Sequence, residues 1–418
     1  MVEETYHAVV IGGGAAGLAA ADAIAGCGYR VAIVEREEML GGVLNQCIHN
    51  GFGLHYFKQE LTGPEYSWRF LKKVLPRENI DIFCSTTVVD ILKNDKKKTV
   101  LCYSHSGVMR VYTRVVVLAM GCRERNRGNI GIPGTRPAGV FTAGLAQRLV
   151  NIEGYVPGKQ VVIVGSGDIG LIMARRMKWV GAEVKGVVEI RSYPSGLTRN
   201  IVQCLNDFSI PLYLSHQVTM IYGKDRVEAV DVTPLEKGIL QHHKTFRITC
   251  DTLLLSVGLI PENELSRKCK IAIHPETGGP IVGADMMSSM EGVFACGNVV
   301  HVHDLVDYVT EESERTAGFA VQYMEGRRVE EQYPVRPCAN VRYVVPSRYT
   351  PAMRNRLYFR PLVVKNNAKL EVVMGGKKVL SKRLLHVQPS EVISVDLKKQ
   401  KLGTMDKAKN KELAISIQ

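Results

Sequence analysis

Short apolar runs and glycine-rich turns alternate at the start of the chain. Residues 6–11 form a β-branched run that predicts a strand, and residues 12–17 form a glycine-rich turn. An alanine-rich stretch then predicts a helix to about residue 26, and residues 31–35 predict a second strand. This order, with glycines at the first turn, is typical of a βαβ unit.

The same pattern returns in the middle of the chain. Residues 161–164 predict a strand, residues 165–170 form a second glycine-rich turn, and a helix extends to about residue 180. Residues 184–189 predict the second strand of this unit, and residues 252–258 predict a strand that closes it. The repeat indicates a duplicated nucleotide-binding unit in an α/β protein.

The remaining segments follow other patterns. Residues 80–118 alternate as in a β meander, and a helix is predicted from about residue 303 to residue 324. From residue 333 onward the chain has short β-rich stretches, and its end, residues 406–418, is expected to be loosely ordered. We therefore predict one βαβ unit inserted into another, followed by a small β-rich module.

The glycines of the first turn each have a physical role. Gly12 permits the tight turn out of the strand, Gly14 lets the backbone approach a pyrophosphate, and Gly17 lets helix and strand pack closely. The helix N-terminus presents free N–H groups to phosphates. Glu35 ends the second strand, where a carboxylate accepts hydrogen bonds from an adenosine ribose. Together these residues predict a dinucleotide site.

The second turn has the same glycine spacing and ends its unit with the acid Glu189. A carboxylate there pairs with a free ribose 2′-hydroxyl and repels a 2′-phosphate, which favours NAD over NADP. Arg191 weakens that preference, because a nearby arginine can accommodate the phosphate. The alternative is that this unit holds an adenine nucleotide only structurally, or holds none.

Length and composition limit the other classes of protein. A chain of 418 residues predicts two to three domains. No apolar run approaches the roughly 20 residues that span a bilayer, and the acidic start lacks the basic region of a signal peptide, so we expect a cytoplasmic protein. The ten cysteines include no C-x-x-C pair, so neither a zinc site nor an iron–sulfur cluster is predicted.

Positive charge is concentrated at the end of the chain. The net charge is +13, and residues 331–418 hold 18 Lys/Arg against 6 Asp/Glu. Such a segment can bind nucleic acid, but these residues form no aromatic-interleaved recognition module, so nucleic acid is not an expected partner. A solvated face, or a docking surface for an acidic partner, is the preferred interpretation.

Two further segments make the pattern more specific. Ala119-Met120-Gly121 and the sequence GVFACGN at residues 292–298 resemble segments of the pyridine nucleotide–disulfide oxidoreductase superfamily, and the similarity covers roughly residues 5–328. The resemblance implies two Rossmann-like, three-layer (ββα) dinucleotide-binding domains, with FAD in the first and NAD(H) in the second. It also implies that the helix after GVFACGN directs its N-terminal dipole at the flavin ring.

The chain departs from the superfamily at two places. Asn298 replaces the usual aspartate that contacts the flavin ribityl chain, although an amide still offers hydrogen bonds to a hydroxyl. Residues 41–55 hold one cysteine, Cys47, where disulfide-reducing members have a pair. A redox-active disulfide needs a partner thiol, so disulfide reductase activity is not expected. Cys47 is either a flavin-adjacent catalytic thiol or a small buried residue.

Residues 41–55, 119–144 and 294–318, with the β-rich tail, carry a closer resemblance. They are similar to flavoprotein subunits found alongside FAD-dependent glycerol-3-phosphate dehydrogenases, and to the α subunits of opine, proline and hydroxyproline dehydrogenases. The resemblance implies an FAD-dependent NAD(P)H oxidoreductase subunit that handles electrons in a multisubunit enzyme. It would transfer hydride or electrons between NAD(H) and a partner flavoprotein dehydrogenase, in a hetero-oligomer or as a homodimer.

The predicted domains are an FAD domain of residues 1–125 and 258–330, a nucleotide domain of residues 126–257, and a basic β-rich module of residues 331–418. The predicted FAD contacts are Gly12, Gly14, Ala15, Ala16, Gly17, Glu35, Arg36, Gly42, Val88, Ala119, Gly121, Gly297 and Asn298. The predicted NAD contacts are Gly165, Gly167, Asp168, Ile169, Gly170, Glu189 and Gly258.

Several other ionisable residues follow the GVFACGN segment. His301 and His303 suggest a metal site, but a complete set of ligands is missing, so no metal is predicted. Glu311, Glu312 and Glu314 are interpreted as a solvated face or an interface of the final helix.

Two other functions remain open. One is a self-sufficient NADH oxidase or NADH:acceptor reductase in which Cys47 handles oxygen or peroxide. The other is a non-catalytic assembly subunit with a structural adenine nucleotide in its second site.

Overall fold

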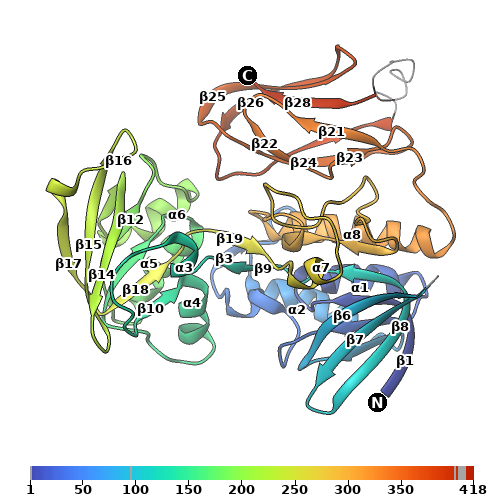
Figure 1. The fold of residues 1–418 in the computed structure, drawn as a ribbon, viewed down its shortest axis with the longest axis horizontal. Coiled ribbons are helices and arrows are strands. Elements are labelled where there is room, and N and C mark those ends of the chain that lie inside the picture. The colour runs from blue at the N-terminus through green and yellow to red at the C-terminus, as the bar shows by residue number, and fades with distance from the viewer. Residues whose placement is uncertain (1, 95–96, 400–401, 403–410) are drawn as a thin grey trace. The chain divides into compact units, whose positions relative to one another are not determined.

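The computed structural model describes residues 2–94, 97–399, 402 and 411–418. The chain divides into two compact units (Figure 1). Unit 1 comprises Met1–Asn45, Asn50–Cys122 and Pro261–Gln418, and unit 2 comprises Gln46–His49 and Arg123–Ile260. Both units are therefore discontinuous in sequence.

The main sheet of unit 1 combines a parallel half with an antiparallel meander. Its order is β5-β2-β1-β8-β7-β6, and β20 pairs with the end of β8. Strands β1, β2, β5, β8 and β20 are parallel to one another, whereas β7 is antiparallel to both β8 and β6. The strands are β1 (Val2–Ile11), β2 (Val31–Val34), β5 (Ile80–Phe83), β6 (Thr86–Asn94), β7 (Lys97–Ser104), β8 (Gly107–Leu118) and β20 (Val293–Ala295).

Helices α1 (Ala15–Gly26), α2 (Gly63–Val74) and α8 (Val306–Met324) belong to the same unit, and α1 packs on α8. Alanine and glycine fill most of α1, and eight of its residues are buried. Small side chains permit this close contact on more than one face. The other elements of this part are η1 (Gly42–Gln46), β3 (Asn50–Phe52), β4 (Leu61–Thr62), α7 (Glu264–Lys268) and η4 (Gly297–Val299).

Unit 2 is built on a five-stranded parallel sheet in the order β10-β18-β11-β12-β13. An antiparallel group of β14, β15, β16 and β17 follows it in sequence. The strands are β10 (Val140–Thr142), β11 (Gln160–Val164), β12 (Glu183–Glu189), β13 (Leu212–Leu214), β14 (His216–Gly223), β15 (Val227–Glu236), β16 (Ile239–Leu240), β17 (Phe246–Thr249) and β18 (Thr252–Leu255). The helices are α3 (Arg127–Ile130), α4 (Ala143–Asn151), α5 (Asp168–Trp179), α6 (Thr198–Cys204), η2 (Asn206–Phe208) and η3 (His242–Lys244). Strands β9 (Cys122–Glu124) and β19 (Leu259–Pro261) lie where the chain crosses between the units.

The C-terminal segment of unit 1 forms two small sheets around a hydrophobic cluster of its own. The first has the order β23-β21-β28-β25-β26 and the second the order β22-β24-β27. The strands are β21 (Tyr333–Pro337), β22 (Val341–Val345), β23 (Arg348–Tyr349), β24 (Asn355–Pro361), β25 (Lys365–Met374), β26 (Lys377–Val387), β27 (Ile393–Leu397) and β28 (Leu413–Ile417). We call residues 331–418 the C-terminal module.

The expectation of a loosely ordered chain end is wrong for its last residues. Strand β28 lies between β21 and β25, and Leu413, Ile415 and Ile417 are fully buried. The sequence LAISI alternates apolar and small residues with the period of a half-buried strand. Residues 403–410, which precede it, lie outside the described part of the chain.

The α/β fold class is confirmed, and the expected meander corresponds to β6, β7 and β8. The strand expected to reach residue 258 ends at Leu255, and the helix expected from residue 303 begins at Val306. Among the described residues, no helix is long and apolar enough to cross a membrane.

Candidate nucleotide sites and a buried His–Glu cluster

The glycine turn between β1 and α1 has the geometry that the three glycine roles require. Gly12 has φ +104°, and a Cβ there would lie 2.5 Å from the carbonyl oxygen of Ala119. A Cβ on Gly17 would lie 1.8 Å from the carbonyl oxygen of Gly12. By contrast, the nearest atom to a Cβ on Gly14 is Gly42 Cα at 3.9 Å. Gly14 therefore borders space that protein does not fill, which is where a pyrophosphate would approach the backbone.

Glu35 is buried at the end of β2 and is bound to the same turn. Its carboxylate accepts hydrogen bonds from the N–H of Gly13 at 2.6 Å and from the N–H of Glu37 at 2.9 Å. These contacts hold the Glu35 side chain at the edge of the sheet where the parallel strands have their C-terminal ends. Each carboxylate oxygen has more than one lone pair, so acceptor capacity remains for ribose hydroxyls.

The turn between β11 and α5 repeats this geometry in unit 2. Gly165 has φ +96°, and a Cβ there would lie 2.1 Å from the carbonyl oxygen of Ser256. A Cβ on Gly170 would lie 2.4 Å from the carbonyl oxygen of Gly165, whereas a Cβ on Gly167 would meet nothing within 4 Å. The middle glycine is again the one that borders open space.

Glu189 takes the place that Glu35 has in the first turn. It accepts hydrogen bonds from the N–H of Ser166 at 2.9 Å and from the N–H of Arg191 at 3.0 Å. The hydroxyls of Ser166 and Ser195 also donate to it, at 2.5 and 3.2 Å. The two serines were not expected to take part. Ser166 lies inside the glycine motif, where a hydroxyl residue is a usable signal, but Ser195 comes close only through the fold.

The other predicted contacts fall in both units. Those in unit 1 lie on the first turn, on α1, at the ends of β2 and β8, or beside Gly14: Ala15, Ala16, Arg36, Gly42, Ala119 and Gly121. Val88 lies on β6 and packs against the core. In unit 2, Ile169 lies on α5 and Gly258 follows β18. The Asp168 carboxylate accepts hydrogen bonds from Leu197 N–H and Asn200 Nδ2, so it holds the loop before α6.

The segment GVFACGN ends β20 and leads into α8. Gly297 has φ +71°, which a glycine adopts without strain. The Asn298 side chain accepts a hydrogen bond from the N–H of His303 at 2.9 Å and donates to Cys122 Sγ at 3.6 Å. The amide at this position therefore shapes the turn that continues to His303.

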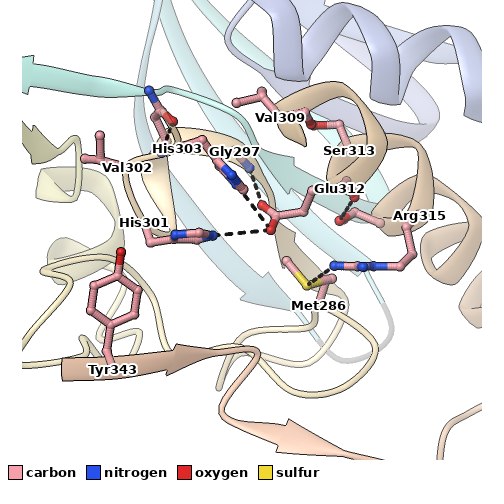
Figure 2. A network of polar contacts seen from close by, with 12 residues as sticks. Met286, Gly297, His301, Val302, His303, Val309, Glu312, Ser313, Arg315 and Tyr343 are labelled. Carbon is pink, nitrogen blue, oxygen red and sulfur yellow. Dashed lines mark hydrogen bonds and ion pairs between the residues drawn. The ribbon is translucent and has the colours of Figure 1, made fainter. Parts of the chain in front are cut away.

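His301, His303 and Glu312 form a cluster in the interior of unit 1 (Figure 2). All three side chains are completely buried. Glu312 Oε2 lies 3.5 Å from His301 Nε2 and 3.4 Å from His303 Nε2. The other carboxylate oxygen accepts the N–H of Gly297 at 2.7 Å.

The interpretation of Glu311, Glu312 and Glu314 as one solvated face is wrong for Glu312. Helix α8 has a buried stripe that includes Val309, Thr316 and Ala320, and Glu312 lies on it. This stripe follows the helical period, so the sequence contained a signal that was missed.

Burial sets the protonation of this cluster. Burial and the neighbouring His303 lower the pKa of His301 to about 4. For Glu312, burial alone would raise the pKa, but the adjacent His303 and His301 outweigh it and hold the pKa well below its usual range. The two histidines and burial thus act in opposite directions on Glu312, whereas burial and His303 both lower the pKa of His301.

Cys47 lies in the short segment that belongs to unit 2. Its Sγ is 3.6 Å from Gln147 Oε1, and burial raises the pKa of the thiol to about 12. The reactive form of cysteine is the thiolate, so this environment favours the small buried residue over the catalytic thiol. All ten cysteines lie in the described part of the chain, and none of them forms a disulfide there.

Comparison with known proteins agrees with this geometry. Residues 6–322 match the family described as pyridine nucleotide-disulphide oxidoreductase. The chain belongs to this family, whose members use FAD and NAD(P)H as oxidoreductases. The predicted superfamily is therefore confirmed, and so is the pair of cofactors at the level of the family.

Among curated proteins, the chain is similar to one of the subunits of the opine oxidase of Agrobacterium tumefaciens (strain Ach5). They are 26% identical over 320 residues, which cover 71% of this chain and 62% of that protein. Hydrogen cyanide synthase subunit HcnB of Pseudomonas protegens is 27% identical over 288 residues, which cover 63% of this chain and 59% of HcnB. The chain therefore spans about three fifths of the length of these relatives.

Among solved structures, thioredoxin reductase of T. acidophilum matches with a TM-score of 0.63 and 21% identity. The match covers 77% of this chain and 99% of that one. A NAD-dependent persulfide reductase from A. fulgidus matches with a TM-score of 0.59 and 20% identity, over 88% of this chain and 68% of that one. These matches establish the fold.

Proposed function

We propose that the chain is the electron-handling subunit of a multisubunit dehydrogenase. It transfers hydride between NAD(H) and FAD, and exchanges electrons with a partner flavoprotein that oxidises glycerol 3-phosphate or a similar substrate. The observation that carries the proposal is the pair of glycine turns with matching geometry. In each turn the outer glycines are packed against backbone, the middle glycine borders open space, and a buried carboxylate accepts two backbone N–H groups.

In this proposal the residues of the chain bind and orient. Gly14 and Gly167 admit the two pyrophosphates, and the N-termini of α1 and α5 stabilise their charge. Glu35 and Glu189 hold the two adenosine riboses. FAD held at Gly14 and Glu35 would supply the hydride-accepting chemistry, and the chain would need to provide no acid or base for it.

NAD is the proposed nucleotide of the second unit because Glu189 is buried and ionisable at the ribose position. A 2′-phosphate would meet this carboxylate at close range. The Arg191 side chain is exposed, donates to Ser195 Oγ at 3.5 Å and lies over the ring of Tyr193 at 5.8 Å. If the second unit preferred NADP to NAD, Arg191 would be the group that binds the 2′-phosphate.

Three observations support the proposed partner. Relatives in the comparison are named as subunits, of opine oxidase and of hydrogen cyanide synthase. Residues 41–55, 119–144 and 294–318 resemble the flavoprotein subunits that accompany glycerol-3-phosphate dehydrogenases. The C-terminal module, with 18 Lys/Arg against 6 Asp/Glu, offers a basic surface to an acidic partner.

We place the reaction in the cytoplasm, where ten cysteines without a disulfide in the described structure are expected.

Anaerobic stopped-flow absorbance tests the proposal. The FAD-loaded chain is mixed with NADH and, separately, with NADPH. Rapid bleaching of the flavin band by NADH, and slow bleaching by NADPH, is the expected result. No bleaching with either nucleotide would instead favour the assembly subunit with a structural adenine nucleotide.

The partner is tested separately. A tagged chain expressed in its native host is expected to copurify with a second flavoprotein that reduces it when glycerol 3-phosphate is added. If NADH-to-dye activity is present but no flavoprotein copurifies, the self-sufficient NADH:acceptor reductase becomes the better description.

A further inference from the structure

Five buried polar atoms without hydrogen-bond partners gather at one place in the interior of unit 1. Among the described residues, both ring nitrogens of His301, both ring nitrogens of His303 and Oε2 of Glu312 are buried and make no hydrogen bond. Buried polar groups are normally paired, and an ionised carboxylate is especially costly to bury alone. The cluster therefore needs an explanation other than internal hydrogen bonding.

The distances distinguish two arrangements. A hydrogen bond between an imidazole N–H and a carboxylate spans roughly 2.7–3.2 Å. The observed separations from Glu312 Oε2 are 3.5 Å to His301 Nε2 and 3.4 Å to His303 Nε2. Two ligands around a tetrahedral zinc ion, each about 2.0–2.1 Å from the metal, lie about 3.3 Å apart. Both separations from Glu312 Oε2 match an edge of such a site.

Only the two imidazoles contact Oε2 of Glu312 among the described residues. In the described part of the chain, no lysine or arginine forms an ion pair with Glu312. The nearby arginines have other partners: Arg315 contacts Met286 Sδ at 3.9 Å, and Arg360 pairs with Asp304 at 3.0 Å. Figure 2 shows the carboxylate directed between the two imidazoles and the backbone of Gly297.

We propose that His301, His303 and Glu312 bind one divalent transition-metal ion, with zinc as the preferred ion. The three ligand atoms lie within 4.8 Å of one another. Two imidazole nitrogens and one carboxylate oxygen suit zinc, whereas magnesium and calcium prefer oxygen ligands alone. A water molecule completes the tetrahedron.

The ligands come from two parts of the chain. His301 and His303 lie in the loop after η4, and Glu312 lies in the second turn of α8. The C-terminal module covers the cluster, because the ring of Tyr358 lies 5.5 Å from His301 and 5.0 Å from His303, centroid to centroid. A metal here would fix the Gly297–Asn298 turn that the family uses for its flavin. This role does not depend on which partner or nicotinamide the chain uses.

Metal analysis of the purified, FAD-loaded chain tests the site. We expect about one zinc ion per chain by inductively coupled plasma mass spectrometry after growth with added zinc. Glu312→Gln and His303→Ala should lose it, with zinc affinity lowered roughly 100-fold or more in competition with a chromophoric chelator. Glu311→Gln is the matched control, because this residue precedes Glu312 on α8 but pairs with Arg356 at 3.4 Å.

A second measurement does not depend on variants. Replacement of the metal by cobalt in the wild-type chain should give the visible absorption bands of tetrahedral cobalt. The proposed metal site is wrong if the wild-type chain binds zinc no better than Glu312→Gln, or if Glu312→Gln retains stoichiometric zinc. FAD content and the thermal unfolding midpoint of each variant separate loss of the ligand from loss of the fold.

Discussion

The carboxylate of Glu312 accepts a hydrogen bond from the backbone N–H of Gly297 at 2.7 Å. A Cβ on Gly297 would lie 2.9 Å from Ala16 Cβ and 3.1 Å from Val309 Cγ1, so the turn also requires glycine. One buried carboxylate thus links α8 to the turn that follows β20, and this turn in turn lies against Ala16 of α1. The candidate metal cluster and the candidate flavin segment share this carboxylate.

Two glycine variants of the first turn should affect protein stability and FAD binding differently. Gly14→Ala is expected to leave the free energy of unfolding within about 0.5 kcal/mol of the wild type, because Gly14 has φ −80° and no atom closer than 3.9 Å to a Cβ. It should still lose bound FAD. Gly17→Ala should cost about 1–3 kcal/mol or more, since its Cβ would overlap the Gly12 carbonyl oxygen. Urea unfolding and the ratio of flavin to protein absorbance measure both effects.

The equivalent change in unit 2 should affect the other nucleotide. A Cβ on Gly167 would have no atom within 4 Å, and Gly167 has φ −67°, which alanine adopts readily. We therefore expect Gly167→Ala to fold normally and to have a normal FAD content. Reduction of the flavin by NADH should slow roughly tenfold or more, the equivalent of about 1.4 kcal/mol of lost binding. If Gly167→Ala were reduced at the wild-type rate, the second turn would not hold the nicotinamide nucleotide.

Cys47 should be dispensable. Burial raises the pKa of its thiol to about 12, so the thiolate is scarce at neutral pH. Cys47→Ser is expected to keep NADH-to-dye activity within about twofold of the wild type. Mass spectrometry should show that iodoacetamide modifies the exposed Cys27 well before Cys47. Loss of peroxide turnover in Cys47→Ser would support the NADH oxidase alternative instead.

Arg360 and Asp304 connect the C-terminal module to the loop before α8. The guanidinium lies 3.0 Å from the Asp304 carboxylate and also donates to the carbonyl oxygen of Val302 at 3.2 Å. Its side chain is 15% exposed. Because the pair is partly buried, a double-mutant cycle of Arg360→Ala and Asp304→Ala should give a coupling energy of about 1–3 kcal/mol in urea unfolding. The exposed pair Arg327 and Glu325 is a control, with an expected coupling below about 1 kcal/mol.

Lys98 should give the chain a pH-dependent stability in the alkaline range. It is 2% exposed, and burial lowers the pKa of its amine from 10.5 to about 8. Below that pKa the folded protein must bury a charged amine, whereas the unfolded chain keeps its proton up to the higher pKa. The wild type should therefore gain stability relative to Lys98→Met between about pH 8 and about pH 10.5, on the order of 2 kcal/mol. Urea unfolding of both chains at about pH 7 and about pH 10 measures the difference.

The repeated unit was predictable because its signals are local. Apolar β-branched runs, glycines at fixed offsets and a terminal acid specify strand, turn, helix and strand within about 30 residues. The same locality explains why β28 was missed. Its five residues follow a polar stretch, and only pairing with β21 and β25 reveals that Leu413 and Ile417 are core residues.

The candidate site was only partly predictable for a related reason. Gly14, Glu35, Gly167 and Glu189 lie within motifs whose spacing carries their role. Ser195 reaches Glu189 through a loop, and its position in the sequence does not indicate that contact. Asp307 is similar, because its carboxylate accepts the N–H of Gly53 at 3.2 Å across more than 250 residues.

By itself, the sequence determined the α/β class, the two nucleotide turns, the family and its cofactors, because these depend on residue types at short, fixed separations. The tertiary structure decided which ionisable groups are buried together. Glu312 is one of three glutamates in four residues, and its helix position alone does not show that it faces His301 and His303. That contact exists because α8 packs on α1 while the C-terminal module covers the loop. This packing buries Oε2 of Glu312, which makes no hydrogen bond, against two imidazole rings.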